Sequence, residues 1–294
     1  MQKQRVIRLI CTVSGFAVLL VLLAITADFM NRFSQLTNKR KDSTRMSLFI
    51  SHRGESFDAP ENTLAAYRLS NERDADGMEC DVHLTADKVL VCGHDFSTQR
   101  MSGVDRIIEE TPFVELELLD VSGRHEAYKD EKIPRFSDSL KTLKPGRKYF
   151  VEIKANDPAV VAAVRKDIVE SGVPFEQIKI ISFQADMIAE SKKVIPEVPA
   201  YWLAHYRIRE DGTPNYTPDE IFVTLERINA DGLDVGGPNE LLTPEFLAEV
   251  KTRGYYLAVW TIDDEERCRY FEANGVDAIT SNKAAAMKAA LHGK

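Results

Sequence analysis

Short apolar or β-branched runs recur along the chain at intervals typical of buried strands. Eight such runs span residues 47–51, 77–82, 148–154, 178–183, 200–204, 232–236, 255–261 and 276–281. Amphipathic segments of helical length separate most of them. Three of these segments open with a residue pair typical of a helix N-terminus, at Asp157-Pro158, Thr217-Pro218 and Thr243-Pro244. The pattern therefore predicts strands and helices in alternation.

Eight strands alternating with helices over about 245 residues indicate an α/β fold, and specifically a (β/α)8 TIM barrel. A doubly wound open sheet is the alternative, but no Gly-x-Gly-x-x-Gly motif opens a helix after the first strand. An extended piece at residues 88–95 follows the second strand without room for a helix, which predicts a hairpin arm. The polar stretch 96–135 then predicts a small insertion after strand two.

The first 45 residues differ from the rest of the chain. Basic residues precede a nearly uncharged run from Leu9 to Ala27, which is about long enough to cross the hydrocarbon core of a bilayer. A buried core helix is the alternative. Because no clear cleavage site follows, we expect an uncleaved signal anchor, a transmembrane helix, at residues 1–30. A basic stalk at 31–46 and a barrel domain at 47–294 complete the expected organisation.

The orientation of this anchor is less evident, since basic residues lie on both sides of the apolar run. A very short cationic tail is hard to translocate, so we expect the tail inside and the main domain outside the cytoplasm, in the periplasm or at the cell surface. Residues 1–45 carry eight basic and two acidic side chains, and the remainder carries 30 basic and 44 acidic ones, a net charge of −14. A domain this acidic is not typical of nucleic-acid-binding proteins. No protein partner is predicted.

Ionisable side chains gather at the ends of the first three barrel strands, the edge at which barrel enzymes place their active sites. The first strand ends on His52-Arg53-Gly54. Glu79 and Asp81 on the second strand are two residues apart and so point to the same face, as do Glu152 and Lys154 on the third. Three carboxylates and a lysine are thus expected to point into the barrel.

Burying these three carboxylates together without a counter-charge would cost on the order of several kcal/mol. We therefore expect Glu79, Asp81 and Glu152 to hold one divalent cation, and oxygen ligands favour Mg²⁺ or Ca²⁺ over zinc or copper. The alternative is that they point outward and pair with helix lysines. Side chains alternate between the two faces of a strand, which places Cys80 and its apolar neighbours on the helix-packed face. This pattern argues against the outward-pointing alternative. The four cysteines show no Cys-x-x-Cys spacing, so no zinc site or disulfide framework is indicated.

His94 ends the extended piece in the motif "GHD". A lone histidine there is more often structural than catalytic. Near His52 and a hard cation, however, it is a candidate second acid–base group, because imidazole titrates near neutral pH. The remaining histidines have no such company and are interpreted as ordinary: His83, His125, His205 and His292.

Five motifs in this order and spacing resemble those of the glycerophosphodiester phosphodiesterase family: "HRG…PENT", "MECDVHLT", "GHD", "VEIK" and "VWTID". The resemblance covers roughly residues 47–290. It implies a metal-dependent hydrolase that cleaves glycerophosphodiesters to sn-glycerol 3-phosphate and an alcohol. The histidines that match the family's general acid and base are His52 and His94, and the matching metal ligands are Glu79, Asp81 and Glu152. Which histidine is the acid, and whether a glycerol hydroxyl or water attacks the phosphorus, stay open.

The resemblance also implies roles in substrate binding. Arg53 matches a phosphate-contacting arginine, Lys154 a position that faces the phosphate, and Trp260 an aromatic that lines the pocket. Glu61 and Asn62 belong to "PENT". Asn62 is well placed as the N-cap of the helix that follows, and Glu61 is well placed to orient either Arg53 or the loop.

Two departures from the family pattern concern the barrel mouth. No proline follows the last strand in "TSNKAAAM", which alters the loop there, and Asp263 stands where an asparagine is common, which predicts a more acidic mouth. Neither departure removes a histidine or a metal ligand. We therefore expect an active enzyme rather than a catalytically inactive binding module.

Lysophospholipids are the alternative substrate class, and they would make the protein a lysophospholipase D acting at the membrane. This alternative requires an apolar groove at the barrel mouth. Its candidate lining residues, which are more typical of a packed core, are Phe96, Phe113, Tyr201, Trp202 and Tyr206.

Overall fold

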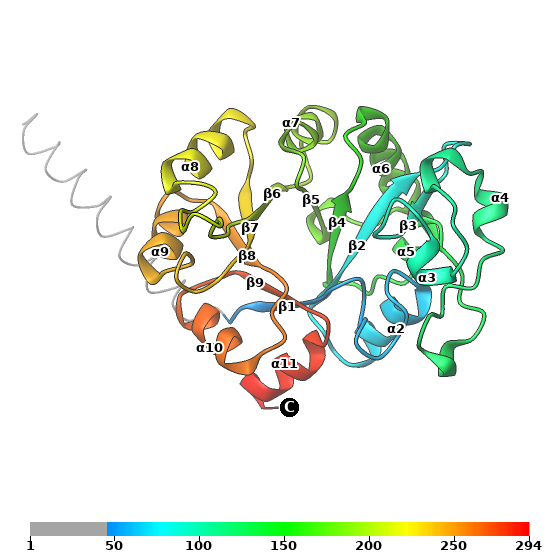
Figure 1. Cartoon of the computed structure of the whole chain (residues 1–294), viewed down its shortest axis with the longest axis horizontal. Helices are drawn as coiled ribbons and strands as arrows, with labels where there is room; N and C mark the ends of the chain where they lie inside the picture. Colours follow the sequence, from blue (N-terminus) through cyan, green and yellow to red (C-terminus); the bar gives the residue numbers. More distant parts are fainter. Residues whose placement is uncertain (1–45, 294) are drawn as a thin grey trace, which may run out of the picture. The chain divides into compact units, whose positions relative to one another are not determined.

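The computed structural model of the protein describes residues 46–293. Eight parallel strands form a closed barrel, and in Figure 1 the helices are arranged in a ring around them. The first strand pairs with both the second and the last, which closes the barrel. Its strands are β1 (Leu48–Ser51), β2 (Gly77–Leu84), β4 (Lys148–Ile153), β5 (Ile178–Ser182), β6 (Ala200–His205), β7 (Gly232–Gly236), β8 (Tyr256–Val259) and β9 (Ala278–Ser281). The predicted TIM barrel is confirmed.

Helices follow the barrel strands and cover them from outside (Figure 1). They are α2 (Leu64–Glu72), α6 (Pro158–Ser171), α7 (Ala185–Val194), α8 (Pro218–Arg227), α9 (Pro244–Thr252), α10 (Glu265–Ala273) and α11 (Ala284–His292), with a 3₁₀ turn η3 (Phe175–Gln177) before β5. The three expected helix starts are observed. The side chains of Asp157, Thr217 and Thr243 each accept a backbone N–H bond from the first turn, which satisfies a donor that the helix leaves free.

Two apolar layers hold the barrel. The outer layer packs the strands against the helices and contains Met78, Cys80 and Val82 from β2, so Cys80 is a core residue as expected. The inner layer fills the barrel and comprises Ile50, Phe150, Ile181, Tyr201, Leu203, Ala258 and Ala278. Because the interior is packed in this way, polar chemistry is confined to the strand ends above this layer.

A hairpin and an insertion separate β2 from β4. Strand β3 (Leu90–Cys92) runs antiparallel to β2, with Cys92 opposite Val82, so the predicted hairpin arm is confirmed. The insertion consists of short pieces: α3 (Gln99–Ser102), η1 (Ile108–Glu110), α4 (Phe113–Leu116), η2 (Glu126–Tyr128) and α5 (Phe136–Leu140). It has a small core of its own, made by Val91, Ile108, Phe113, Leu116, Val121 and Ile133.

The expected transmembrane anchor at residues 1–30 and nearly all of the basic stalk at 31–46 lie outside the described residues. Among residues 46–293, none of the helices combines the length and the apolar character needed to cross a bilayer.

Candidate active site

Three carboxylates meet at the ends of two neighbouring strands. Parallel pairing places Asp81 of β2 directly beside Glu152 of β4, and Glu79 lies two residues earlier on the same face. One oxygen from each residue lies within 4.8 Å of the others. All three residues are buried, with exposures of 2% for Glu79, 1% for Asp81 and 8% for Glu152. The outward-facing alternative is therefore excluded.

Burial and mutual repulsion disfavour full ionisation of this cluster. Burial, followed by the neighbouring charge of Asp81, raises the pKa of Glu79 well above its usual range and that of Glu152 to about 8. Asp81 shows the opposite shift. Although burial opposes its ionisation, Lys154 and Arg53 hold the pKa of Asp81 well below its usual range. The cluster thus carries repulsion that a bound cation would relieve.

Two cations of the chain contact the cluster without neutralising it. Lys154 Nζ lies 2.8 Å from Glu152 Oε1 and 3.4 Å from Asp81 Oδ1. The Arg53 guanidinium Nε lies 3.3 Å from Asp81 Oδ2, and the Arg53 backbone N–H donates to Glu79 Oε2 at 2.7 Å. Two positive charges therefore face three carboxyl groups, and one negative charge is left over when all three are ionised, as they would be around a cation.

These residues fit a divalent cation. The Asp81 Oδ1 atom is buried and accepts no hydrogen bond in the described structure, and buried acceptors are rarely left in that state. Carboxylate oxygens are the ligands that Mg²⁺ and Ca²⁺ prefer. A dication would also turn the excess of one negative charge into an excess of one positive charge, which suits a phosphodiester monoanion. The cluster of Glu79, Asp81 and Glu152 could therefore hold a metal ion.

Asn62 fixes Asp81 rather than capping a helix. Its backbone adopts a left-handed conformation, with φ at 57°. The side-chain Nδ2 donates to Asp81 Oδ2 at 2.8 Å, and Asn62 Oδ1 accepts from the Asp81 backbone N–H at 3.1 Å. The N-cap of α2 is Thr63. The N-cap interpretation of Asn62 is therefore wrong, because the left-handed turn redirects its side chain into the site.

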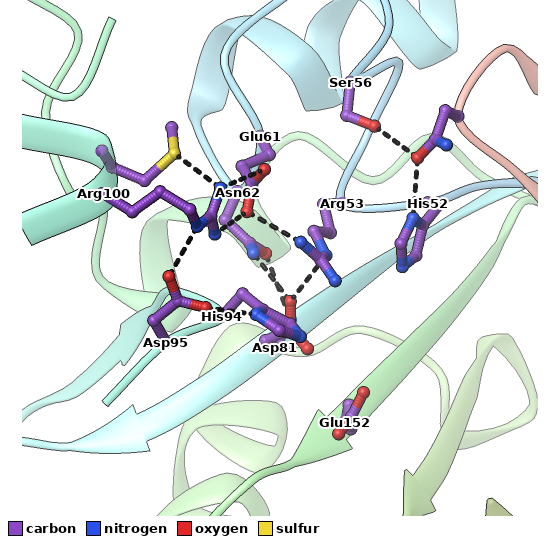
Figure 2. A network of polar contacts seen from close by, with 12 residues as sticks. His52, Arg53, Ser56, Glu61, Asn62, Asp81, His94, Asp95, Arg100 and Glu152 are labelled. Atoms are coloured by element: carbon purple, nitrogen blue, oxygen red, sulfur yellow. Dashed lines mark hydrogen bonds and ion pairs between the residues drawn. The ribbon is translucent and has the colours of Figure 1, made fainter. Parts of the chain in front are cut away.

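A chain of polar contacts joins His94 to Arg53 (Figure 2). His94 Nδ1 lies 2.6 Å from Asp95 Oδ1, and Arg100 Nε donates to Asp95 Oδ2 at 2.6 Å. Arg100 Nη2 donates to Glu61 Oε1 at 2.7 Å, and Arg53 Nη1 donates to the same oxygen at 2.9 Å. Glu61 therefore orients Arg53, as expected from the sequence.

The electrostatics of this chain constrain His94. Burial opposes ionisation of Asp95, but Arg100 and His94 lower the pKa of Asp95 to about 2. At neutral pH Asp95 is thus a carboxylate that only accepts hydrogen bonds. The proton between the two residues therefore belongs to Nδ1 of His94.

His52 has a different environment. Its Nδ1 lies 2.8 Å from Oδ1 of Asn282, which directly follows β9. Burial and the adjacent charge of Arg53 lower the pKa of His52 to about 4, against the opposing influence of Asn282 and Asp81. His52 is therefore neutral at physiological pH. Figure 2 shows Arg53 between the two histidines.

The comparisons with known proteins identify the family of the chain. The model of the glycerophosphoryl diester phosphodiesterase family matches residues 52–286. The chain belongs to this family. A glycerophosphodiester phosphodiesterase from Caldanaerobacter subterraneus is 28% identical over 243 residues, which cover 80% of this chain and 94% of the relative. A human lysophospholipase D is 29% identical over 147 residues, which cover 48% of this chain and 46% of the relative.

A solved structure shows that the similarity to known proteins includes the fold. The Oleispira antarctica phosphodiesterase, solved in complex with the product sn-glycerol-3-phosphate, has a TM-score of 0.74 and 25% identity, and the match covers 84% of this chain and 97% of that one. The family expected from the five motifs is thus confirmed.

Trp260, Phe183 and His205 form a cluster of rings at the carboxyl ends of β8, β5 and β6. Trp260 follows β8, and its Nε1 donates to the Asp234 carbonyl oxygen at 3.3 Å. The indole makes an edge contact with Phe183 at 5.4 Å between centroids and lies 5.8 Å from His205. A Cβ at Gly236 would lie 2.9 Å from the indole, so glycine permits this placement. Trp260 is therefore available to line the mouth, as the resemblance implies.

The five aromatics considered for an apolar groove differ in exposure. Of the five aromatics considered, Phe96 is 51% exposed. The other four are buried, with exposures between 2% and 5%: Phe113, Tyr201, Trp202 and Tyr206. The interpretation of these aromatics as core residues is confirmed for these four, because they fill the barrel layers and the core of the insertion.

Several residues of this site were not predicted as part of it. Asp95 directly follows the motif histidine His94, and Asn282 directly follows the last strand. Their positions in the sequence could therefore have indicated that they belong to the site. His83 is fully buried, and its Nε2 lies 3.3 Å from the His94 carbonyl oxygen, so it supports the backbone of the site. Arg100 lies in the insertion, whose sequence has no regular period, and nothing in the pattern pointed to it.

Proposed function

We propose that the protein is a metal-dependent phosphodiesterase that hydrolyses glycerophosphodiesters to sn-glycerol 3-phosphate and an alcohol, with His52 and His94 as general base and general acid. One observation supports this most strongly. A buried cluster of three carboxylates lies beside two histidines that differ in their hydrogen-bond partners, with Arg53 between them. The family match and the relatives support the same activity.

Two cationic side chains bind the phosphate in this proposal. Arg53 and Lys154 are the positive groups at the cluster, and both are largely buried, with side-chain exposures of 17% and 12%. Electrostatic attraction is stronger there than in bulk water. Trp260 packs against an uncharged part of the substrate. When bound, a Mg²⁺ or Ca²⁺ ion held by Glu79, Asp81 and Glu152 would neutralise charge on the phosphate oxygens.

The two histidines move protons in opposite directions. His52 is neutral, so it accepts the proton of the attacking hydroxyl group at Nε2. In the acid role His94 donates an Nε2 proton to the oxygen of the departing alcohol, while its Nδ1 stays bonded to the Asp95 carboxylate. These roles are the same whether the attacking group is a glycerol hydroxyl or water.

Product release with and without metal tests this function. Full-length protein is incubated with glycerophosphocholine, and sn-glycerol 3-phosphate is measured before chelation, after chelation and after addition of Mg²⁺ or Ca²⁺. We expect chelation to lower turnover by roughly 100-fold or more and the cation to restore it. Unchanged turnover in protein shown to be free of divalent metal would contradict the proposal.

Lysophospholipids are the second candidate substrate class. The human lysophospholipase D relative supports them, as do three phenylalanines in or beside the segments that follow β1, β3 and β5: Phe57, Phe96 and Phe183, which are 56%, 51% and 40% exposed. Lysophosphatidylcholine in the same assay separates the two classes. We expect kcat/KM for it to be roughly 10-fold or more below that for glycerophosphocholine. The reverse order would identify a lysophospholipase D.

We also propose that an N-terminal helix anchors the protein in a membrane with the catalytic domain outside the cytoplasm. The apolar run from Leu9 to Ala27 and the basic residues around it support this placement. Protease treatment of intact cells, or of spheroplasts where there is an outer membrane, should cleave the catalytic domain from the membrane fraction. Recovery of the full-length protein in the soluble fraction would contradict the anchor.

A further inference from the structure

The side-chain amide of Asn282 is held in one orientation by Asp263, from the loop after β8. Asn282 Nδ2 lies 2.6 Å from Asp263 Oδ2, and the Asn282 backbone N–H donates to Asp263 Oδ1 at 2.8 Å. Ser281 Oγ also donates to Asp263 Oδ1, at 2.7 Å. A carboxylate surrounded by donors accepts from all of them. The NH₂ end of the amide therefore faces Asp263, and its oxygen faces away.

This orientation selects a tautomer of His52. Asn282 Oδ1 lies 2.8 Å from His52 Nδ1, and Ser56 Oγ donates to the same oxygen at 3.0 Å. An amide oxygen can only accept, so Nδ1 must carry the proton and Nε2 the lone pair. In Figure 2 the rest of the ring extends from this bond into the space beside Arg53.

We propose that Asp263 and Asn282 are positioning residues that keep His52 in the tautomer with its proton on Nδ1. The proposal rests on the proposed general-base role of His52, because only a nitrogen with a free lone pair can accept a proton. The charged groups that act on His52 are Arg53, Asp81 and Glu61. They alter its proton affinity, but none of them bonds to Nδ1, so they select no tautomer.

The tautomer can be measured directly. Full-length protein labelled with ¹⁵N-histidine gives separate nitrogen shifts for protonated and unprotonated ring nitrogens, and the His52 signals are those missing from His52→Gln. In wild type we expect a protonated Nδ1 and an unprotonated Nε2. In Asn282→Ala we expect a mixture of tautomers and a kcat roughly 10-fold to 100-fold lower, with KM changed by less than about threefold.

Exchanging the two side chains tests the arrangement in a second way. In the double variant Asp263→Asn/Asn282→Asp, the new amide at position 263 can donate to the new carboxylate at position 282. That carboxylate also presents an acceptor oxygen to His52 Nδ1. We expect it to restore the Nδ1–H tautomer and most of kcat, and to move the acidic limb of the kcat/KM profile to higher pH, because a carboxylate then faces His52. Asn239→Ala, which removes an exposed amide bonded to Arg267, is the matched control and should leave the tautomer and kcat unchanged.

Two results would overturn the proposal. One is a His52 in Asn282→Ala that keeps the wild-type tautomer together with a kcat within about twofold of wild type. The other is a loss of kcat that follows loss of thermal stability in all variants while the tautomer stays fixed. Failure of the proposed function is recognised separately: His52→Gln would then retain full activity, whereas the tautomer is measured in the resting protein without turnover.

Discussion

At the scale of single residues, the two histidines differ in what lies behind their rings. His94 faces the negatively charged Asp95 carboxylate, whereas His52 faces the neutral amide of Asn282 and adjoins Arg53, whose charge adds to burial in lowering the pKa of His52. This difference assigns the acid to His94 and the base to His52 in our account. Asp263, which departs from the family pattern, has a structural role here. Its carboxylate is bonded to the loop after β9 rather than adding an unpaired charge to the mouth.

A leaving group that needs no proton tests this assignment. Loss of a general acid should cost roughly 10²- to 10⁴-fold in kcat for glycerophosphocholine. In His94→Gln we expect most of this loss to disappear with the p-nitrophenyl ester of glycerol 3-phosphate, because nitrophenolate departs unprotonated. His52→Gln should be impaired on both substrates. Equal impairment of His94→Gln on the two esters would contradict the assignment.

Arg100 should matter for activity more than for stability. Its side chain is 46% exposed, and exposed ion pairs contribute only about 0–1 kcal/mol. Replacement by methionine nevertheless frees Asp95 and Glu61, which orient His94 and Arg53. We expect Arg100→Met to lower kcat/KM roughly 10-fold with little change in the free energy of unfolding. The control is Arg269→Met, at a 56% exposed arginine far along the chain in α10, and wild-type activity in Arg100→Met would refute the role.

At the scale of elements, the barrel strands were predictable and the insertion was not. Each strand between two apolar layers shows a short apolar run, and the period of two residues within β2 separated Glu79 and Asp81 from the apolar side chains between them. The insertion has short 3₁₀ and helical pieces with no sustained period, so the partners it supplies could not be inferred. The N-cap prediction for Asn62 was wrong for a local reason. Asn62 and Thr63 are adjacent and both are good N-cap residues, and only the left-handed turn at Asn62 distinguishes them.

The core of the insertion supports His94 and Asp95. These two residues lie beside a small cavity that Met101 and Ile108 of the insertion also line. Leu116 is fully buried in this core, and Leu116→Ala should destabilise the insertion by roughly 2–5 kcal/mol. We expect hydrogen exchange to accelerate mainly within residues 89–135, and kcat to fall.

Leu118→Ala is the matched control for this change, because Leu118 is 73% exposed in the same segment. It should alter the free energy of unfolding by no more than about 0.5 kcal/mol and leave kcat unchanged. Uniform acceleration of exchange across the barrel in Leu116→Ala would show that the insertion is not a separate packing unit.

At the scale of the whole molecule, the carboxylate cluster couples stability to pH and to metal. The pKa of Glu152 rises from its ordinary 4.5 to about 8 in the folded chain, so between these values the folded state binds more protons than the unfolded state. Stability must then fall as pH rises through this range. His52 acts in the opposite direction, since its pKa is lowered from 6.5 to about 4, but only below pH 6.5. The interval from 6.5 to 8 therefore isolates the carboxylates.

Thermal unfolding of chelated and metal-loaded protein tests this coupling. From pH 6.5 to 8 we expect the chelated protein to lose on the order of 1–2 kcal/mol, from the part of the Glu152 shift that falls in this interval. The stabilisation by Mg²⁺ or Ca²⁺ should grow over the same interval. In Glu152→Gln the loss should be smaller, and the remainder comes from Glu79 and Asp234, whose pKa values burial also raises. A chelated wild-type protein whose stability is constant or rises over this range would contradict the electrostatic account.

The central claim is that the carboxylate cluster and the two histidines together release sn-glycerol 3-phosphate. The most direct measurement is kcat/KM for its release from glycerophosphocholine, at saturating divalent cation, in wild type, His52→Gln, His94→Gln, Glu152→Gln and the control His125→Gln. We predict losses of roughly 100-fold or more in the first three variants and none in the control. Wild-type kcat/KM in any of the three would contradict the account.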